Sequence, residues 1–142
     1  MEFSFLTMGT ASALPTANRY PSAHILTVRE RLFLIDCGEG AQMQMRKYGV
    51  SVGKIDNIFI SHLHGDHMFG LFGLLSTLAM GGRTSDMHIY APQGLQRTLD
   101  FFLAEFGEGI KYKIDFHSIQ CKEPVQIYDS KQVEVFAFPL VH

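Results

Sequence analysis

Apolar residues occur in short runs that alternate with polar residues or are bounded by turn-forming residues, a pattern typical of β-strands. The charged segment 29–31 separates two such runs and predicts a β-hairpin. A loop at residues 11–21, which contains Pro15 and Pro21 with turn-forming residues between them, follows the first run. In full, we expect strands at residues 3–8, 23–28, 32–35, 55–60, 87–90, 112–119, 125–128 and 133–138.

Three segments have the features of helices, namely residues 39–48, 68–80 and 95–106. In the first, Glu39 lies near the start and Gly49 follows the end, which the helix dipole and C-cap preferences favour. The second is apolar almost all round, which predicts a buried helix. In the third, we expect the helically spaced phenylalanines to pack in the core: Phe101, Phe102 and Phe106.

Length and composition favour a single domain. The chain has 142 residues, of which 46% are apolar, and it contains no internal repeat, low-complexity run or linker. We therefore treat residues 1–142 as one unit. Because the chain stops at His142 directly after a predicted strand, we expect this unit to be one half of a larger domain.

The charge balance and the cysteines restrict the function classes further. A formal net charge of −2 excludes nucleic-acid binding through bulk positive charge. No run reaches the ~18 apolar residues of a membrane helix, and the N-terminus lacks the features of a signal peptide. We therefore expect a cytoplasmic protein with no membrane partner. Cys37 and Cys121 are far apart in sequence, which predicts buried thiols in a reducing compartment, with a disulfide as the alternative.

The segment Ser61-His62-Leu63-His64-Gly65-Asp66-His67 concentrates candidate metal ligands. Imidazole nitrogen and carboxylate oxygen suit zinc, manganese and iron. In an extended segment His62 and His64 point to the same side, and a sharp turn at Gly65 would bring Asp66 and His67 beside them. The pattern predicts half of a two-metal site on a loop between a strand and a buried helix. Surface histidines with ordinary hydrogen bonds are the alternative.

This HxHxDH segment resembles the signature of the metallo-β-lactamase superfamily. The segment Asp36-Cys37-Gly38-Glu39-Gly40, with Gly9-Thr10 and residues 15–19, is similar to the ribonuclease Z family of tRNA 3′-processing endonucleases. Pro139-Leu140-Val141-His142 resembles the next metal motif of that family. The resemblance implies an αβ/βα sandwich, with a mixed sheet flanked by helices, of which this chain is the N-terminal half.

Metal ligands follow from the same resemblance. It implies that His62, His64 and His142 bind one Zn²⁺ ion, and that Asp66 and His67 bind a second. A complete active site of the family holds two zinc ions. The ligand types alone leave Mn²⁺ or Fe²⁺ open.

The remaining roles also come from the resemblance. Asp66 would be catalytic as the proton acceptor for the attacking water, and Asp36 would support the metal loop. Residues Pro15, Thr16 and Arg19 match the family's substrate-binding loop. For Arg19, a solvated loop arginine is an equal alternative to a phosphate contact.

The resemblance implies that the parent protein is a homodimeric endoribonuclease that removes the 3′ trailer from precursor tRNA. Two positions depart from the family's loop pattern, where Ala17 and Tyr20 replace a lysine and an asparagine. Further catalytic motifs of the family would lie beyond residue 142, so we expect this chain alone to be inactive. The alternatives are another hydrolase of the superfamily, acting on a small phosphodiester, sulfate ester or thioester, or an inactive metal-binding half-domain.

Other residues have simpler explanations. His24, His88 and His117 lie within strand patterns, where we expect structural histidines and not ligands. Arg83 follows a glycine pair, so it would either reach the rim of the site or lie in a solvated turn.

Overall fold

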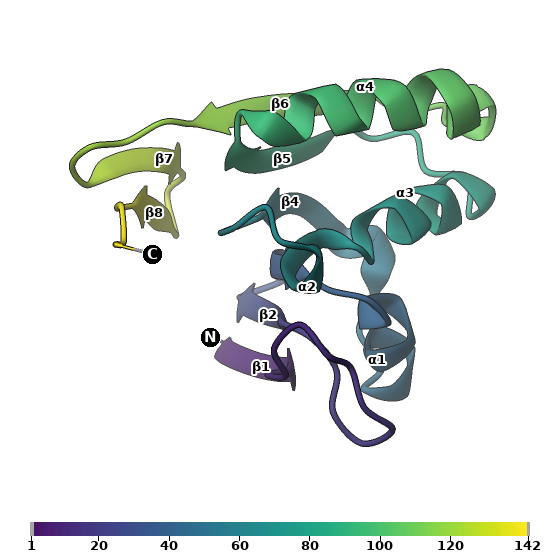
Figure 1. The fold of residues 1–142 in the computed structure, drawn as a ribbon, viewed down its shortest axis with the longest axis horizontal. Helices are drawn as coiled ribbons and strands as arrows, with labels where there is room; N and C mark the ends of the chain where they lie inside the picture. The colour runs from purple at the N-terminus through teal and green to yellow at the C-terminus, as the bar shows by residue number, and fades with distance from the viewer. Residues whose placement is uncertain (1, 142) are drawn as a thin grey trace.

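The computed structural model describes residues 2–141. A six-stranded sheet with the strand order β1-β2-β3-β4-β5-β6 forms its centre (Figure 1). The strands β1 (Phe3–Gly9), β2 (Ala23–Val28) and β3 (Arg31–Cys37) pair antiparallel. The strands β4 (Ile55–Phe59), β5 (Met87–Pro92) and β6 (Ile114–Ile119) continue from β3 in parallel. The expected α/β class with a mixed sheet is therefore confirmed.

Helices connect the parallel strands and cover one face of the sheet. Helix α1 (Ala41–Lys47) and the 3₁₀ turn η1 (Val52–Lys54) connect β3 to β4, and α2 (Gly65–Met68) and α3 (Leu71–Met80) connect β4 to β5. Helix α4 (Gly94–Phe106) and the turn η2 (Gly107–Gly109) connect β5 to β6. The main core lies between these helices and the sheet, and its fully buried side chains include Leu34, Met45, Ile58, Leu74, Ile89 and Leu95.

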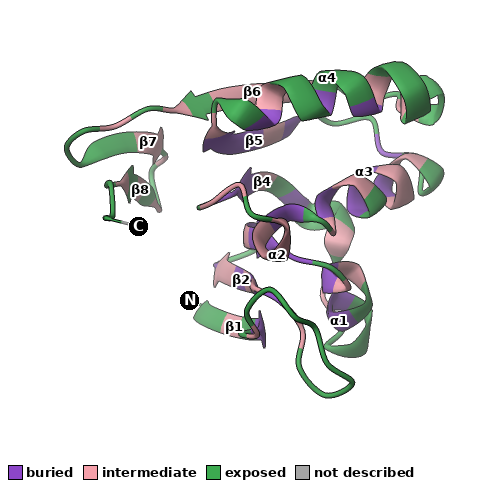
Figure 2. Cartoon of the chain, in the orientation of Figure 1, coloured by how far each residue is buried: buried purple, intermediate pink, exposed green. Residues whose placement is uncertain are grey.

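The opposite face of the sheet carries a smaller, aromatic cluster. Phe33, Phe59 and Tyr90 lie there, and the hairpin of β7 (Val125–Asp129) and β8 (Glu134–Ala137) packs against them. The ring of Tyr128 on β7 meets Phe33 edge-on at a centroid distance of 5.3 Å. The hairpin forms a two-stranded sheet of its own beside the six-stranded one (Figure 1), and much of it is exposed in Figure 2. One face of the sheet is thus well covered, whereas the other is only partly covered.

Two predicted helices differ from those observed. Helix α1 begins at Ala41, because Gly40 adopts a φ of 81°, and Glu39 therefore lies outside the first turn. The expected helix over 68–80 is divided into α2 and α3. The division occurs because the Gly70 N–H donates to the carbonyl of Cys37, at 2.9 Å, instead of continuing a helical ladder.

The phenylalanines of α4 and the two cysteines can be compared with what the sequence led us to expect. Phe102 is buried, but Phe101 and Phe106 are 63% and 67% exposed, so the prediction that all three belong to the core is wrong. Helix α4 presents them on its outer surface, along an apolar groove with Phe72 of α3. Cys37 is buried and Cys121 partly buried, and both are free thiols.

Arg83 is neither at the rim of the site nor in a solvated turn. Its guanidinium is buried and donates to the carbonyls of Ile55 and Asp86 at 2.9 and 2.8 Å and to the Asp56 carboxylate at 2.7 Å. The side chain thus joins the start of β4 to the start of β5. Within residues 2–141, no helix is long and apolar enough to cross a membrane.

Candidate metal centre

The histidine-rich segment begins where β4 ends. Because β3, β4 and β5 are parallel, their carboxyl ends lie at one edge of the sheet, where ligand sites of α/β proteins commonly form. Asp36 occupies the end of β3, and His62 and His64 follow β4. The sheet topology therefore brings two distant sequence motifs to the same edge.

Four side chains of the HxHxDH segment gather there. The ring centroids of His62 and His64 are 4.0 Å apart, and those of His62 and His67 are 5.4 Å apart. The Nε2 atom of His67 lies 3.5 Å from Oδ2 of Asp66. Asp66 and His67 belong to the short helix α2, not to a loop as expected. The expected ligand His142 lies outside the described residues.

Asp36 orients His67. Its buried carboxylate accepts a hydrogen bond from Nδ1 of His67, with 2.8 Å between Nδ1 and Oδ2. A histidine whose Nδ1–H donates to a carboxylate presents the lone pair of Nε2, the arrangement that supports many metal-bound histidines. The same carboxylate accepts from the backbone N–H of Ser61 at 2.9 Å and from the hydroxyl of Ser22 at 2.8 Å.

A second histidine extends this hydrogen-bond network. The Nε2 atom of His24 lies 3.3 Å from the Ser22 hydroxyl, whose own proton is donated to Asp36. Burial lowers the pKa of His24, and the Asp36 carboxylate opposes this effect only in part. A neutral His24 with its proton on Nε2 donates to Ser22. Sequence reasoning missed both Ser22 and His24 as parts of the site, because neither has a spacing signal.

Close backbone contacts fix the end of β3 against α2. Asp36 has a φ of 59°, a left-handed conformation that asparagine and aspartate tolerate better than most residues. A Cβ atom at Gly38 would lie 2.6 Å from the carbonyl oxygen of Asp66, and a Cβ atom at Gly70 would overlap the carbonyl oxygen of Gly38. These glycines allow the supporting segment and the metal-ligand segment to touch through their backbones.

Gly65 has a different role from the one expected. Its φ is not in the left-handed range, but a Cβ atom there would overlap the ring of Phe69. The glycine therefore makes room for an aromatic side chain, and the turn does not depend on its conformational freedom.

The expected substrate-binding residues lie on an exposed loop between β1 and β2, which projects beyond the sheet in Figure 1. The Thr16 N–H donates to the carbonyl of Arg19 at 3.0 Å, and the Arg19 N–H donates to the Thr16 hydroxyl at 3.1 Å. Pro15, Thr16 and Arg19 are all exposed. This turn presents the Arg19 side chain on the surface.

The chemistry of the donors fits a divalent metal ion. Three imidazoles and a carboxylate are the ligands that zinc-type ions accept, and His67 is already oriented by its carboxylate partner. The partial exposure of His62, Asp66 and His67 leaves access to the cluster.

The chain has the metallo-β-lactamase fold, and the cluster of candidate metal ligands lies at the sheet edge described above. A metallo-β-lactamase fold protein from Bacillus subtilis matches it with a TM-score of 0.65 and 18% identity, over 93% of this chain and 55% of that chain. More narrowly, residues 3–142 match the family described as anti-Pycsar protein Apyc1, and the chain belongs to that family.

The chain is also similar to proteins named ribonuclease Z, as the motifs predicted. The chain is 46% identical to ribonuclease Z of Bacteroides thetaiotaomicron over 141 residues, covering 99% of this chain and 45% of the relative. It is 42% identical to ribonuclease Z of Methanococcus aeolicus, covering 95% of this chain and 42% of the relative. The crystal structure of human tRNase Z, short form, matches with a TM-score of 0.89 and 32% identity, over 97% of this chain and 60% of that chain. The chain thus spans less than half the length of these two curated relatives.

Proposed function

We propose that this chain supplies the metal-binding part of an endoribonuclease that removes the 3′ trailer from precursor tRNA. The observation that carries the proposal is the Asp36–His67 hydrogen bond beside His62, His64 and Asp66. The similarity to proteins named ribonuclease Z supports the tRNA substrate.

In this proposal His62, His64 and His142 hold one Zn²⁺ ion, and Asp66 and His67 hold the second. Bound there, divalent ions supply a Lewis acid for the scissile phosphate and make water a better nucleophile at neutral pH. Asp66 accepts a proton from the attacking water through its carboxylate. Asp36 keeps the Nδ1 proton of His67 in place, so that Nε2 remains directed into the cluster.

The exposed loop is the proposed contact for the RNA end. Two hydrogen bonds of the Arg19 backbone, one with the Thr16 N–H and one with the Thr16 hydroxyl, hold this residue in place. They leave its guanidinium accessible to a phosphate. The formal net charge of −2 gives this chain little electrostatic attraction for tRNA, which supports a tRNA-binding surface that lies mostly outside it. We further propose that this protein is a cytoplasmic homodimer, and that the 142-residue chain alone is inactive because it spans about 45% of its relatives.

A second candidate is another hydrolase of the same fold, acting on a small phosphodiester, sulfate ester or thioester. The family match under a name other than ribonuclease Z favours keeping this candidate. The exposed loop also lacks the lysine expected for a tRNA-processing member, since Ala17 occupies that position. An inactive metal-binding half-domain remains the third candidate.

A chimera tests these candidates. The aligned 141-residue segment of Bacteroides thetaiotaomicron ribonuclease Z is replaced by this chain, which restores a full-length protein. A trailer-bearing precursor tRNA and a chromogenic phosphodiester are then offered side by side. We expect cleavage of the tRNA, and loss of that cleavage in the His64→Ala chimera but not in the Asp100→Asn chimera.

Each other outcome is informative. Cleavage of the small ester alone overturns the proposed tRNA activity. A folded chimera that binds zinc but cleaves neither substrate supports the half-domain candidate. The 142-residue chain is assayed in parallel, and tRNA cleavage by it would contradict the proposed inactivity of the isolated chain.

A further inference from the structure

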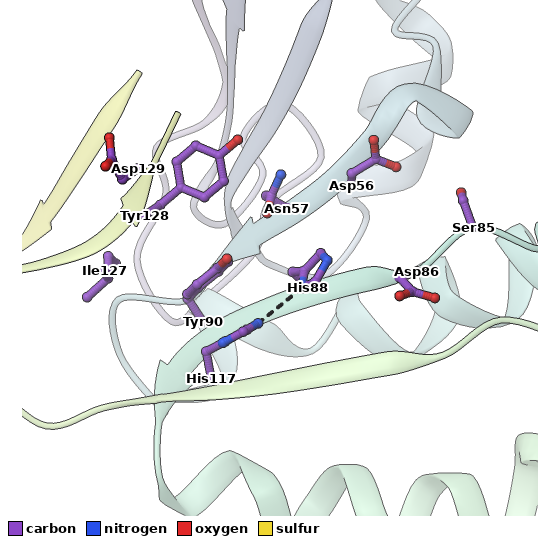
Figure 3. A pocket seen from close by; sticks show the side chains of 10 residues that line it. All are labelled: Asp56, Asn57, Ser85, Asp86, His88, Tyr90, His117, Ile127, Tyr128 and Asp129. Atoms are coloured by element: carbon purple, nitrogen blue, oxygen red, sulfur yellow. Dashed lines mark hydrogen bonds between the residues drawn. The ribbon is translucent and has the colours of Figure 1, made fainter. Parts of the chain in front are cut away.

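A second group of metal-ligand side chains lies on the face of the sheet opposite the helices. His88 is on β5, and Asp115 and His117 are on β6. In the pairing of these strands His88 is opposite Asp115, and Tyr90 is opposite His117. The three side chains therefore project from adjacent positions on one face, as Figure 3 shows for the two histidines.

Three donor atoms of this group converge. The Nδ1 atom of His88 lies 3.0 Å from Nε2 of His117, and Oδ2 of Asp115 lies 3.5 Å from each of these nitrogens. Each side chain contributes one donor atom, and all three donors lie within 4.8 Å of one another. The group is partly buried, with between 33% and 38% of each side chain exposed.

The distances from the Asp115 carboxylate to the two histidine nitrogens are longer than those of a hydrogen-bonded carboxylate. Asp36 approaches His67 to 2.8 Å, the usual length of a charge-assisted hydrogen bond. Asp115 instead stands at 3.5 Å from both nitrogens, too far for a strong hydrogen bond to either. Ligands at about 2.0–2.2 Å from a tetrahedral zinc are separated from one another by roughly 3.3–3.6 Å. The triangle of donor atoms thus has nearly the dimensions of one face of such a coordination tetrahedron.

The surroundings hold the donors in place and favour a cation. The Tyr90 ring stacks on His117 at 4.4 Å with an interplanar angle of 11°, and Phe59 stacks on Tyr90 at 4.9 Å. A cavity of about 500 Å³ adjoins the histidines, and its lining residues include Asp86 and Asp129, together with Asp56, whose carboxylate is paired with Arg83. A three-residue ligand set leaves a coordination position for water or another molecule from this cavity.

We propose that His88, Asp115 and His117 form a second metal site, which binds a divalent transition cation such as Zn²⁺ and is separate from the HxHxDH segment. Metal binding replaces the hydrogen bond between the two histidines. The proton of that bond moves to the other nitrogen of the same ring, so that Nδ1 of His88 and Nε2 of His117 both offer lone pairs. In this proposal His88 and His117 are ligands, whereas the sequence pattern alone led us to expect structural histidines.

The test uses the 142-residue chain with His62→Ala and His64→Ala, which removes two ligands of the first centre. Zinc bound per chain is measured by elemental analysis after gel filtration, and affinity by calorimetric titration with ZnCl₂. We expect one ion per chain in this background. Adding His117→Gln should weaken binding by roughly tenfold or more, whereas adding Asp86→Asn, which removes a charge from the same cavity but no ligand, should weaken it much less.

A second measurement covers the case in which the multiple variants fold poorly. Histidine ring signals of the unaltered chain are followed by NMR during zinc addition, with the single variants His88→Gln and His117→Gln used for assignment. We expect the signals of His88 and His117 to shift together and to saturate. Unshifted signals at millimolar zinc, or an unchanged zinc affinity when His117→Gln is added to the folded background variant, would overturn the proposal.

Discussion

Oδ2 of Asp36 lies 2.8 Å from Nδ1 of His67, and this contact joins the end of β3 to the helix that follows β4. The carboxylate is buried and also accepts hydrogen bonds from Ser22 and Ser61. One side chain therefore connects three segments that are distant in the sequence. The orientation of His67, a proposed metal ligand, therefore depends on the segments that carry Ser22, Asp36 and Ser61.

Replacing Asp36 with Asn should weaken metal binding at the HxHxDH segment. Asparagine also adopts the positive φ that residue 36 requires, so the backbone should be unchanged. The amide lacks the negative charge and offers only one acceptor oxygen, so Nδ1 of His67 loses its strong partner. We expect a fall in zinc affinity of about 10- to 100-fold, measured by calorimetric titration. Asp100→Asn, an exposed change of equal charge on α4, serves as the control. Equal affinities of the two variants would contradict the role given to Asp36.

Replacing Gly70 with Ala should destabilise the fold, because the added methyl group would overlap the carbonyl oxygen of Gly38. Relief requires moving α2 away from β3. We expect a loss of about 2 kcal/mol or more in the free energy of unfolding, measured by urea denaturation. Gly53→Ala is the matched control, since no atom lies within 4 Å of its added Cβ and its φ is not positive. If both variants unfold at the same urea concentration, the close contact between position 70 and the Gly38 carbonyl does not determine the stability of the fold.

Replacing Arg83 with Ala should leave the exposed Asp56 carboxylate and the carbonyls of Ile55 and Asp86 without their donor. Loss of a buried, multiply hydrogen-bonded charge costs about 2–4 kcal/mol. Arg83→Lys should recover only part of this, because an ammonium cannot reproduce the planar set of donors. The exposed Arg97→Ala provides the baseline in the same thermal or urea unfolding measurement. Full rescue by lysine would show that charge alone matters.

The two thiols should differ in reactivity. Burial, assisted by the nearby Asp36 charge, raises the pKa of Cys37 from 9.0 to about 12. At pH 8, a thiol reagent should label Cys121 rapidly and Cys37 only after unfolding.

The linked change in stability has a definite sign. A proton is bound more tightly in the folded chain, so stability from this thiol is complete below pH 9.0 and decreases as pH rises towards about 12. Cys37→Ala should make the decline in unfolding free energy over this interval shallower by up to about 1.4 kcal/mol per pH unit. Unchanged slopes in urea denaturation at several pH values would argue against the raised pKa.

Sequence patterns located most strands within one or two residues because alternation and turn residues are local properties. The division between α2 and α3 was not predictable in this way. It depends on a hydrogen bond from Gly70 to Cys37, a residue 33 positions earlier in the printed sequence. The same limitation applies to Phe101 and Phe106, whose helical spacing is compatible with either face of α4.

For the candidate site, the ligand-bearing segment was recognisable because its residues are close together in the sequence. Its support was only partly recognisable. The resemblance pointed to Asp36, but Ser22 and His24 become connected to it only through the pairing of β2 with β3. His88 is separated in the sequence from Asp115 and His117 by α4 and η2, and only the register of β5 and β6 brings the three together.

The contact between Gly38 and Gly70 also bears on how the sequence can vary during evolution. Backbone atoms alone set the distance between the end of β3 and the start of α3. Outward-facing positions of α3 are therefore free to change without moving Asp66 or His67, whereas neither glycine can be exchanged alone. Substitution rates along this region should consequently be as low at these two residues, which carry no side chain at all, as at the proposed metal ligands.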